Sequence, residues 1–308
     1  MSRQNKEQFV SYGMRCSVAI LILMLSACAS NMVLGKVYGG FGSRTAKQFK
    51  SHARFSAQQI AEIDKLADSY HSWHRSTQLP LYTALMRRIV ADIDVDSDLS
   101  LPVAEGWWQS VQGFADRMRV CNPLNASGEL LLGLTDKQVL QVADKLRADL
   151  SEREAEYLSE NAEQRLAERI SRITKWGKRA GASFNQRQKE LLHRTLAEQI
   201  SLGEQRYHLR RVWIEEFISL LVQRTQPDFK SKIRQHIDTV WQLTASTYPD
   251  QWQHNERLWI SFFRDYINLQ TDDQRERFSL KLLTTAGTLE KQAAVKVDAQ
   301  PACYQGAY

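Results

Sequence analysis

The chain has 308 residues, of which 43% are hydrophobic and 25% are charged, with 41 Lys and Arg against 35 Asp and Glu. This length suits one large domain or two small ones. The net charge of +6 is a mild excess that is spread along the chain. It reflects ordinary solubility and excludes the basic footprint of a nucleic-acid-binding protein.

The first segment has the composition of a signal peptide. Arg3, Lys6 and Arg15 precede the apolar run Cys16–Ala27. That run is roughly half of the ~20 apolar residues that a transmembrane helix needs. A basic start, a short apolar run and small residues at its end together predict a secretory signal.

The end of the apolar run indicates lipidation. Leu25-Ser26-Ala27-Cys28 resembles the bacterial lipobox, where a signal peptidase cuts before a lipidated cysteine. We predict that residues 1–27 are a lipoprotein signal peptide, starting at Met1 or Met14, and that lipid on Cys28 anchors the chain to the membrane. Ala29 follows the cysteine, and by the sorting rule of enterobacterial lipoproteins it implies the periplasmic face of the outer membrane. The alternatives are an ordinary signal peptide and a weak membrane anchor.

The next segment, residues 28–54, contains four glycines and five Lys or Arg, and no acidic residue. We expect a lipidated N-terminus followed by a flexible basic tether. The tether either lies against phosphate groups of the membrane surface or is a solvated linker. A helical periplasmic domain is expected over residues 55–292, and residues 293–308 are expected to be an unstructured tail.

From Ser56 onward, apolar and charged residues recur every three or four positions, which predicts helices throughout. The fold class is therefore all-α, a multi-helix bundle of about seven helices. The expected helices span residues 56–79, 81–93, 103–119, 135–178, 185–224, 228–247 and 250–291, with a kink or restart at Pro80 and a break near Gln270. A helix over 135–178 exceeds a compact domain, so it either breaks near Ser159–Asn161 or protrudes as an arm.

Four of the expected helix starts share one device. Ser56, Thr135, Asn185 and Thr271 are each followed three residues later by glutamine. This spacing predicts a capping box, in which the cap oxygen accepts a backbone N–H and the glutamine side chain reaches back to the cap. The recurrence also raises the hypothesis of a duplication in two halves.

Two segments carry a resemblance. Trp73–Met86, WHRSTQLPLYTALM, and Arg172–Leu192 resemble landmarks of a family of uncharacterised proteobacterial lipoproteins, known only as a domain of unknown function. The resemblance implies class and location, and no activity. Before Phe55 the chain departs from the family, which often carries an aromatic, acidic stretch there. Leu134–Gln138 is also similar to the L-T-x-x-Q motif of small periplasmic stress chaperones.

A kinked aromatic segment is the candidate binding site. Trp73, Arg75 and Tyr82 lie around Pro80, where they form either a cleft or a packed kink whose arginine bonds a freed carbonyl. Asp68, His71 and His74 are spaced three apart on one helix face, as metal ligands can be. No matching ligand pair is evident elsewhere, so we expect no metal. No nucleotide or nucleophile motif appears, so we predict no catalytic residue and no cofactor.

The two cysteines outside the signal and the lipobox are Cys121 and Cys303. In the oxidising periplasm they form either a disulfide or two free buried thiols. A disulfide would tie the C-terminal tail to the middle of the chain.

Two classes of function compete. The first is a non-enzymatic envelope protein that binds a protein or cell-wall partner, or its own copy; a periplasmic chaperone-like client binder is a variant of it. The second is a cell-wall hydrolase that uses Glu105, Glu215 or Glu216. A hydrolase requires a cleft with two suitably spaced carboxyl groups. Without a catalytic motif, we expect the binding class.

Overall fold

The computed structural model describes residues 38–95 and 98–295, and every regular element in these ranges is a helix. The all-α class is confirmed, but these residues form eleven α-helices of ten residues or more, in place of about seven. They are α3 (Phe41–Lys50), α4 (Ala57–Trp73), α5 (Leu79–Val95), α6 (Leu101–Val120), α8 (Asp136–Ser159), α9 (Ala162–Arg179), α10 (Gln186–Glu198), α11 (Gly203–Val222), α12 (Phe229–Thr239), α14 (Pro249–Asn268) and α15 (Asp272–Ala293). Shorter elements are the π-helix η2 (His74–Gln78), the 3₁₀-helix η3 (Pro123–Ala126), α7 (Gly128–Leu132) and α13 (Leu243–Thr247). The signal peptide, Cys28, Cys303 and most of the expected tail lie outside the described residues.

The helix expected over residues 135–178 is two helices, α8 and α9. Glu160 has an extended backbone (φ −99°, ψ 143°), and Asn161 then caps α9 together with Gln164. The predicted break is thus confirmed. The protruding arm is wrong, because α8 packs on α11 and α9 packs on α10.

Residues 185–224 also form two helices where one was expected. The break lies between α10 and α11, where the Asn255 side chain bonds both the N–H and the carbonyl of Ile200 at 2.9 Å. These bonds replace the helical bonds that the backbone gives up. Further along, residues 228–247 divide into α12 and α13, and the expected break near Gln270 separates α14 from α15.

Pro80 does not end the first long helix. The backbone passes through the π-turn η2, in which the Leu79 N–H bonds the His74 carbonyl, and α5 follows at once. Pro80 is the second residue of α5 and directly follows the widened turn, a local adjustment that lets a helix continue past a residue without an N–H. The expected interruption is therefore a single widened turn.

The expected tether is partly wrong. Residues 41–50 form α3, which packs on α4 and buries Ala46. Its Lys50 ammonium pairs with Asp64 at 2.5 Å. Gly42 fits α3 closely against α4, since an added Cβ would lie 3.0 Å from Asp68 Oδ1. Glycine here permits close packing rather than flexibility.

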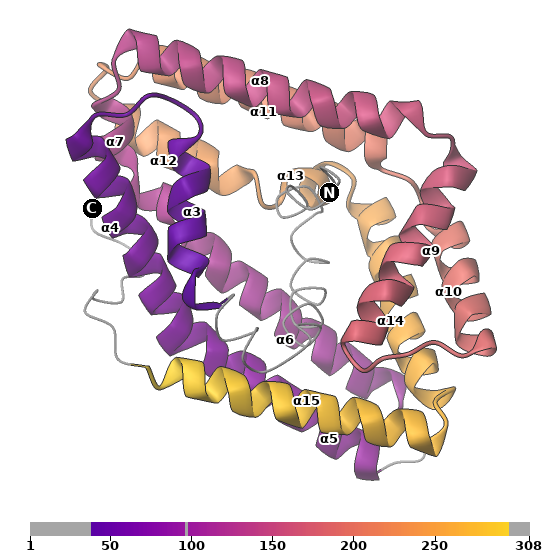
Figure 1. The fold of residues 1–308 in the computed structure, drawn as a ribbon. Coiled ribbons are helices and arrows are strands. Elements are labelled where there is room, and N and C mark those ends of the chain that lie inside the picture. The colour runs from indigo at the N-terminus through magenta and orange to yellow at the C-terminus, as the bar shows by residue number, and fades with distance from the viewer. Residues whose placement is uncertain (1–37, 96–97, 296–308) are drawn as a thin grey trace, which may run out of the picture.

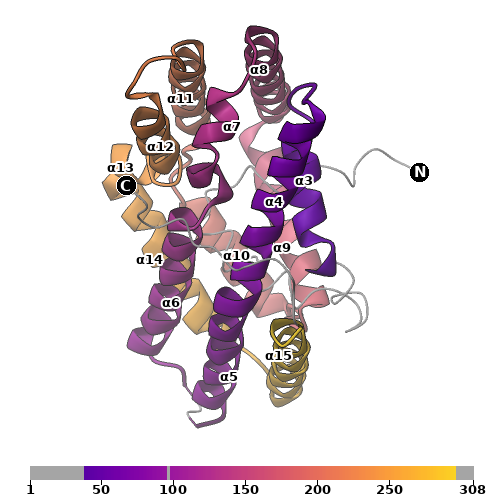
Figure 2. The same cartoon turned by 90° about the vertical axis from the view of Figure 1, so that its left-hand side faces the viewer.

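The long helices are arranged in pairs around a four-sided frame (Figure 1). One edge is the pair α8 and α11, and the opposite edge is the pair α5 and α15. Figure 2, turned by 90°, shows α8 and α11 at one end of the molecule and α5 and α15 at the other. Each edge has its own core: α5, α6, α14 and α15 contribute to the larger one, and α8, α11 and α12 to the smaller.

All four predicted capping boxes are present, and they meet in two pairs. The Gln138 side-chain amide donates to Oε1 of Gln59 at 2.7 Å, and the Gln59 amide donates back to Oε1 of Gln138 at 3.2 Å, which joins the starts of α4 and α8. Gln274 donates to Gln188 at 3.1 Å, which joins the starts of α10 and α15. We call each contact a glutamine clamp.

The clamps show a repeated plan. Each half, residues 41–159 and 162–293, begins with a helical hairpin, α3–α4 or α9–α10, whose second helix starts at a capping box. Each half ends with a helix that starts at the second box, α8 or α15. These last helices are exchanged, since α8 packs on α11 of the second half and α15 packs on α5 of the first. Between the boxes the halves differ, with α6 and α7 in one and α12, α13 and α14 in the other.

Candidate functional site

The predicted cleft residues lie in a packed junction around the π-turn. Trp73 and Arg75 are each 5% exposed and Tyr82 is fully buried. His74 lies between two phenols, with Tyr38 Oη 2.8 Å from its Nδ1 and Tyr82 Oη 3.4 Å from its Nε2. The segment is therefore closed by its own side chains.

Arg75 links the junction to the end of the chain. Its Nη1 donates to the Gln292 carbonyl at 3.2 Å, in the last turn of α15, and its Nη2 donates to His71 Nε2 at 3.3 Å. Its guanidinium also lies 5.4 Å from the centre of the Tyr38 ring. A cation at a helix C-terminus is favourable because the last carbonyls carry partial negative charge. Of the two predicted alternatives, the packed kink agrees with this burial, although the carbonyl that Arg75 bonds belongs to α15.

The histidines and tyrosines of the junction are held neutral. Burial lowers the pKa of His74 to about 3, with a smaller effect from His71. Burial and the charges of Arg75 and Arg44 lower the pKa of His71 to about 4. Burial also raises the pKa of Tyr38 and Tyr82 above the ordinary value. These neutral rings pack against one another, and both ring nitrogens of His74 lie within hydrogen-bond distance of tyrosine hydroxyls.

Asp68, His71 and His74 do not form a metal site. Both ring nitrogens of His74 contact tyrosine hydroxyls, and Nε2 of His71 accepts from Arg75. Among the described residues, no group of three His, Cys, Asp or Glu side chains is placed to hold an ion.

The candidate hydrolase carboxylates are exposed. Glu105 lies on the surface of α6, and Glu216 is 63% exposed at 3.6 Å from His236. Glu215 receives two hydrogen bonds from Arg147, at 2.8 and 2.5 Å, which hold its pKa below the usual range. A general acid needs the opposite shift, produced by burial away from cations.

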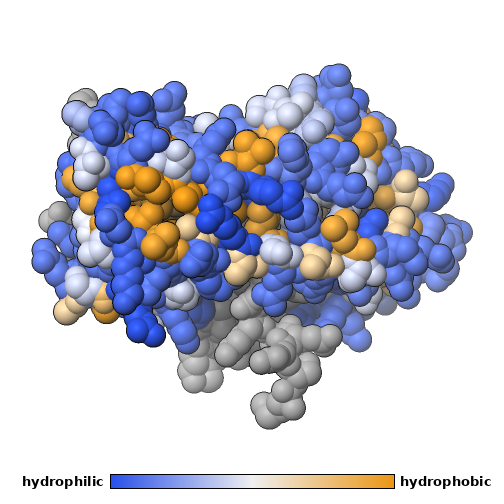
Figure 3. All heavy atoms as spheres, turned by 90° about the horizontal axis from the view of Figure 1, so that it is seen from above, coloured by the Kyte–Doolittle hydropathy of each residue, from blue (hydrophilic) through white to orange (hydrophobic). Residues whose placement is uncertain are grey.

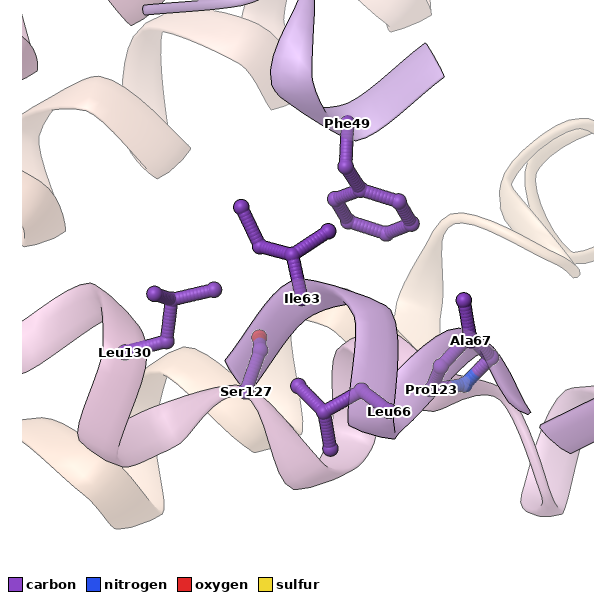
Figure 4. Close-up of a pocket in the computed structure, with 7 residues that line it drawn as sticks. All are labelled: Phe49, Ile63, Leu66, Ala67, Pro123, Ser127 and Leu130. Atoms are coloured by element: carbon purple, nitrogen blue, oxygen red, sulfur yellow. The ribbon is translucent and has the colours of Figure 1, made fainter. Parts of the chain in front are cut away.

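Cavities in the described part of the chain include one beside the α3–α4 hairpin and one at the start of α10. The first, of about 10 Å³, lies between α3, α4 and α7, with Phe49 above Ile63 and Leu130 at one side (Figure 4). It has room for about one water, and its apolar lining makes it a dry packing defect. The second is an open depression of about 480 Å³ at the starts of α10 and α15, and residues 185–187 and 268–271 line it.

Cys121 is disulfide-bonded. It lies 4% exposed against Tyr70 and Trp73, next to the π-turn. Its partner is outside the described residues, so the pairing with Cys303 stays a prediction.

A protein-family model matches most of the chain. Residues 54–249 match DUF6279, a family of unknown function. The chain belongs to this family. Both segments that carry the resemblance lie inside the DUF6279 region, whereas α3 and α15 lie outside it. No similar protein of curated function and no similar solved structure was found.

No described helix of this DUF6279 member is long and apolar enough to cross a membrane. Sequence reasoning found Trp73, Arg75 and Tyr82, but it missed Tyr38 and Gln292, which complete the junction. Neither carries a local signal, because their contacts join segments that are 36 and 217 residues apart in the chain.

Proposed function

We propose that this protein is a non-catalytic binding protein of the bacterial envelope, held by lipid on Cys28 at the periplasmic face of the outer membrane. The observation that carries the proposal is the state of the side chains that catalysis would need. His71 and His74 are buried and neutral, and the candidate carboxylates are exposed or paired. What the molecule offers to a partner is its helical surface.

The lipobox supports the location, and tethering supports the class. A lipid fixes the chain to one surface, which raises its effective concentration for partners on that surface. This helps a binder more than an enzyme that acts on diffusing substrates. The outer faces of α8 and α9 carry exposed charge, including Glu152 and Glu156, and we assign partner recognition to these faces.

The anchor is tested by Cys28→Ala and cell fractionation. We expect the variant in the soluble periplasmic fraction and the natural chain in the outer membrane. Full function of the released variant would contradict the need for a surface tether.

The partner surface is tested by crosslinking in cells. We expect the double variant Glu152→Lys and Glu156→Lys to capture less of its partner while it keeps its helical content. The matched control is Glu276→Lys, an exposed reversal on α15 at the opposite edge of the frame. Equal loss of capture in both variants would contradict a surface on α8 and α9, and an intact fold that loses function with Glu105→Gln would favour the hydrolase.

A chaperone-like role is the second candidate, and exposed apolar side chains favour it. Leu140 of α8 and Val222 of α11 are 64% and 63% exposed. Figure 3, seen from the side of α8 and α11, shows apolar patches interrupting a polar surface. Such patches mark interaction sites in soluble proteins. If clients bind there, the chain suppresses light scattering by an aggregating denatured protein, and Leu140→Ser with Val222→Ser removes the suppression.

A further inference from the structure

The pair α8 and α11 changes character along its length. At one end α8 buries Val139 and Val142, with Leu146 and Leu150 partly buried, and α11 buries Trp213 and Phe217. At the end near α9, the same helical faces continue with other side chains: Arg153 and Tyr157 on α8, and Arg206 and Arg210 on α11. An apolar seam thus gives way to arginine and tyrosine.

These side chains form a contiguous group that also includes α9. The Tyr157 and Tyr207 rings lie 5.3 Å apart. The Arg165 guanidinium lies 4.4 Å from the Tyr157 ring centre, and Arg206 lies 6.0 Å from that of Tyr207. Tyr157 also packs against Gly203, where a Cβ would lie 2.0 Å from its hydroxyl oxygen. We call Arg153, Arg165, Arg206 and Arg210, with the two tyrosines, the arginine cluster.

The cluster concentrates positive charge in half-buried positions. Burial and the neighbouring charges of Arg153 and Arg206 lower the pKa of Arg210. Neither Arg153 nor Arg210 forms an ion pair with a carboxylate in residues 38–95 and 98–295. Such an arrangement is destabilising unless an anion completes it.

The nearby carboxylates do not neutralise the arginine cluster, because one is paired with another arginine and another lies among like charges. Glu154 pairs with Arg211, on another face of α11. Burial and the charges of Glu168 and Glu156 raise the pKa of Glu160, although Arg165 opposes this shift. Arg165 itself donates to the Tyr157 and Glu160 carbonyls, which fixes its position at the turn between α8 and α9.

We infer that the arginine cluster is a binding site for a phosphoryl group. Guanidinium groups match phosphate oxygens with paired N–H donors. Arg165, which lies over the Tyr157 ring and donates to two backbone carbonyls, is held in place before the ligand arrives. The phosphoryl group belongs either to a lipid headgroup or to a soluble phosphate. The inference names a ligand class for the binding role proposed above and rests on that role, but it does not depend on the lipid anchor.

The test uses the full chain with Cys28→Ala, so that failure of the anchor does not affect it. Inorganic pyrophosphate is titrated by calorimetry, and co-sedimentation compares phosphatidylglycerol vesicles with phosphatidylcholine vesicles. We expect saturable binding of pyrophosphate, at least about tenfold weaker in Arg153→Gln and Arg210→Gln, because each removes a charged donor. The control Arg87→Gln, an exposed arginine on α5 paired with Glu290, keeps the affinity.

Two further measurements identify the source and exclude misfolding. If the chain co-sediments with phosphatidylglycerol vesicles and Arg210→Gln abolishes this, the ligand is a lipid headgroup. If the chain binds pyrophosphate but not the vesicles, the ligand is a soluble phosphate. Without ligand, Arg210→Gln is expected to keep or raise the melting temperature, because it relieves repulsion between like charges. The inference is overturned if neither probe binds saturably. It is also overturned if Arg153→Gln and Arg210→Gln bind pyrophosphate as tightly as the parent Cys28→Ala chain.

Discussion

His74 shows how one residue can set the acid sensitivity of this fold. It is 2% exposed, between the hydroxyls of Tyr38 and Tyr82, and has no carboxylate neighbour among its described contacts. Protonation would bury a charge without a counter-ion, which burial in this setting strongly disfavours. The junction is therefore stable while the imidazole stays neutral.

A pH dependence follows. The folded pKa of His74 is about 3 and its ordinary value is 6.5, so the unfolded chain binds more protons between these values. Stability is full above pH 6.5 and falls with acidification, by about 1.4 kcal/mol per pH unit from His74. Urea unfolding at pH 7.0, 5.5 and 4.5 is expected to show a loss of about 2.7 kcal/mol at pH 4.5 relative to His74→Gln. If stability falls with pH equally in the natural chain and in His74→Gln, the assignment to His74 is refuted. His193→Gln, at an exposed histidine, serves as the control.

Gly177 and Gly113 make a matched pair of helix glycines. A Cβ at Gly177 would lie 2.6 Å from the Phe184 ring and 2.7 Å from the Ala182 carbonyl oxygen, whereas nothing lies within 4 Å at Gly113. We expect Gly177→Ala to cost about 1–3 kcal/mol, because the backbone of the α9–α10 turn must move. Gly113→Ala is expected to gain about 0.5–1 kcal/mol from helix propensity. Chemical denaturation measures both, and a stabilising Gly177→Ala would show that the hairpin can yield.

The predicted disulfide between Cys121 and Cys303 would also stabilise the fold. If Cys121 pairs with Cys303, with 181 residues between them, the loop-entropy argument gives about 4–5 kcal/mol of stabilisation. Mass spectrometry of a non-reduced digest is expected to find the linked peptides. Two alkylatable thiols in the mature chain would end this assignment.

At the scale of elements, the glutamine clamps do more than cap helices. Gln188 is fully buried, and its amide donates to the Tyr266 carbonyl at 3.0 Å while its oxygen accepts from Gln274. Gln164 is the corresponding glutamine of the α9 capping box. It is exposed, and within the described residues it contacts no glutamine of another capping box. A comparison of Gln188 with Gln164 therefore distinguishes the stability due to the glutamine clamp from that due to the helix cap.

We expect Gln188→Ala to cost about 2–4 kcal/mol, because it leaves buried polar groups unpaired. Gln164→Ala is expected to cost only about 0.5–1 kcal/mol, the worth of an exposed cap. Equal costs in thermal unfolding would mean that the clamp adds nothing. A double-mutant cycle on Gln59 and Gln138 is expected to show coupling at the other clamp.

The predictable elements are the locally encoded ones. Capping boxes depend on residues three apart, so all four were found from the sequence. The break between α10 and α11 depends on Asn255, 55 residues away from Ile200, and has no local signal. Helix α3 was missed because its glycines suggested flexibility, whereas packing on α4 holds Gly42 in a helix. The junction likewise depends on Tyr38, which only the folded chain brings to His74.

At the scale of the molecule, the exchange of α8 and α15 makes each half depend on the other. The halves are joined covalently only at the turn between Ser159 and Asn161 and through whatever disulfide Cys121 forms. The noncovalent contacts between them include two helix pairs with buried cores. Loss of the covalent turn therefore removes little of the packing.

A protease site inserted between Glu160 and Asn161 tests this interdependence. After cleavage in reducing buffer, we expect the nicked chain to elute as one particle with unchanged helical content. The two fragments are expected to separate only in denaturant. Separation under native conditions would show that the exchanged helices do not hold the halves together.

The position of α15 also bears on the order in which the chain can fold as it is made. Helix α5 is synthesised early, and α15, which covers it, is the last of the described helices. Arg87 therefore cannot pair with Glu290 until 203 more residues have been made. Until then the face of α5 that meets Leu282, Ala286 and Leu289 stays open to solvent. A chain interrupted before α15 therefore exposes this apolar face, and exposed apolar surface favours aggregation. The last helix acts as the closing step that separates a complete molecule from a fragment.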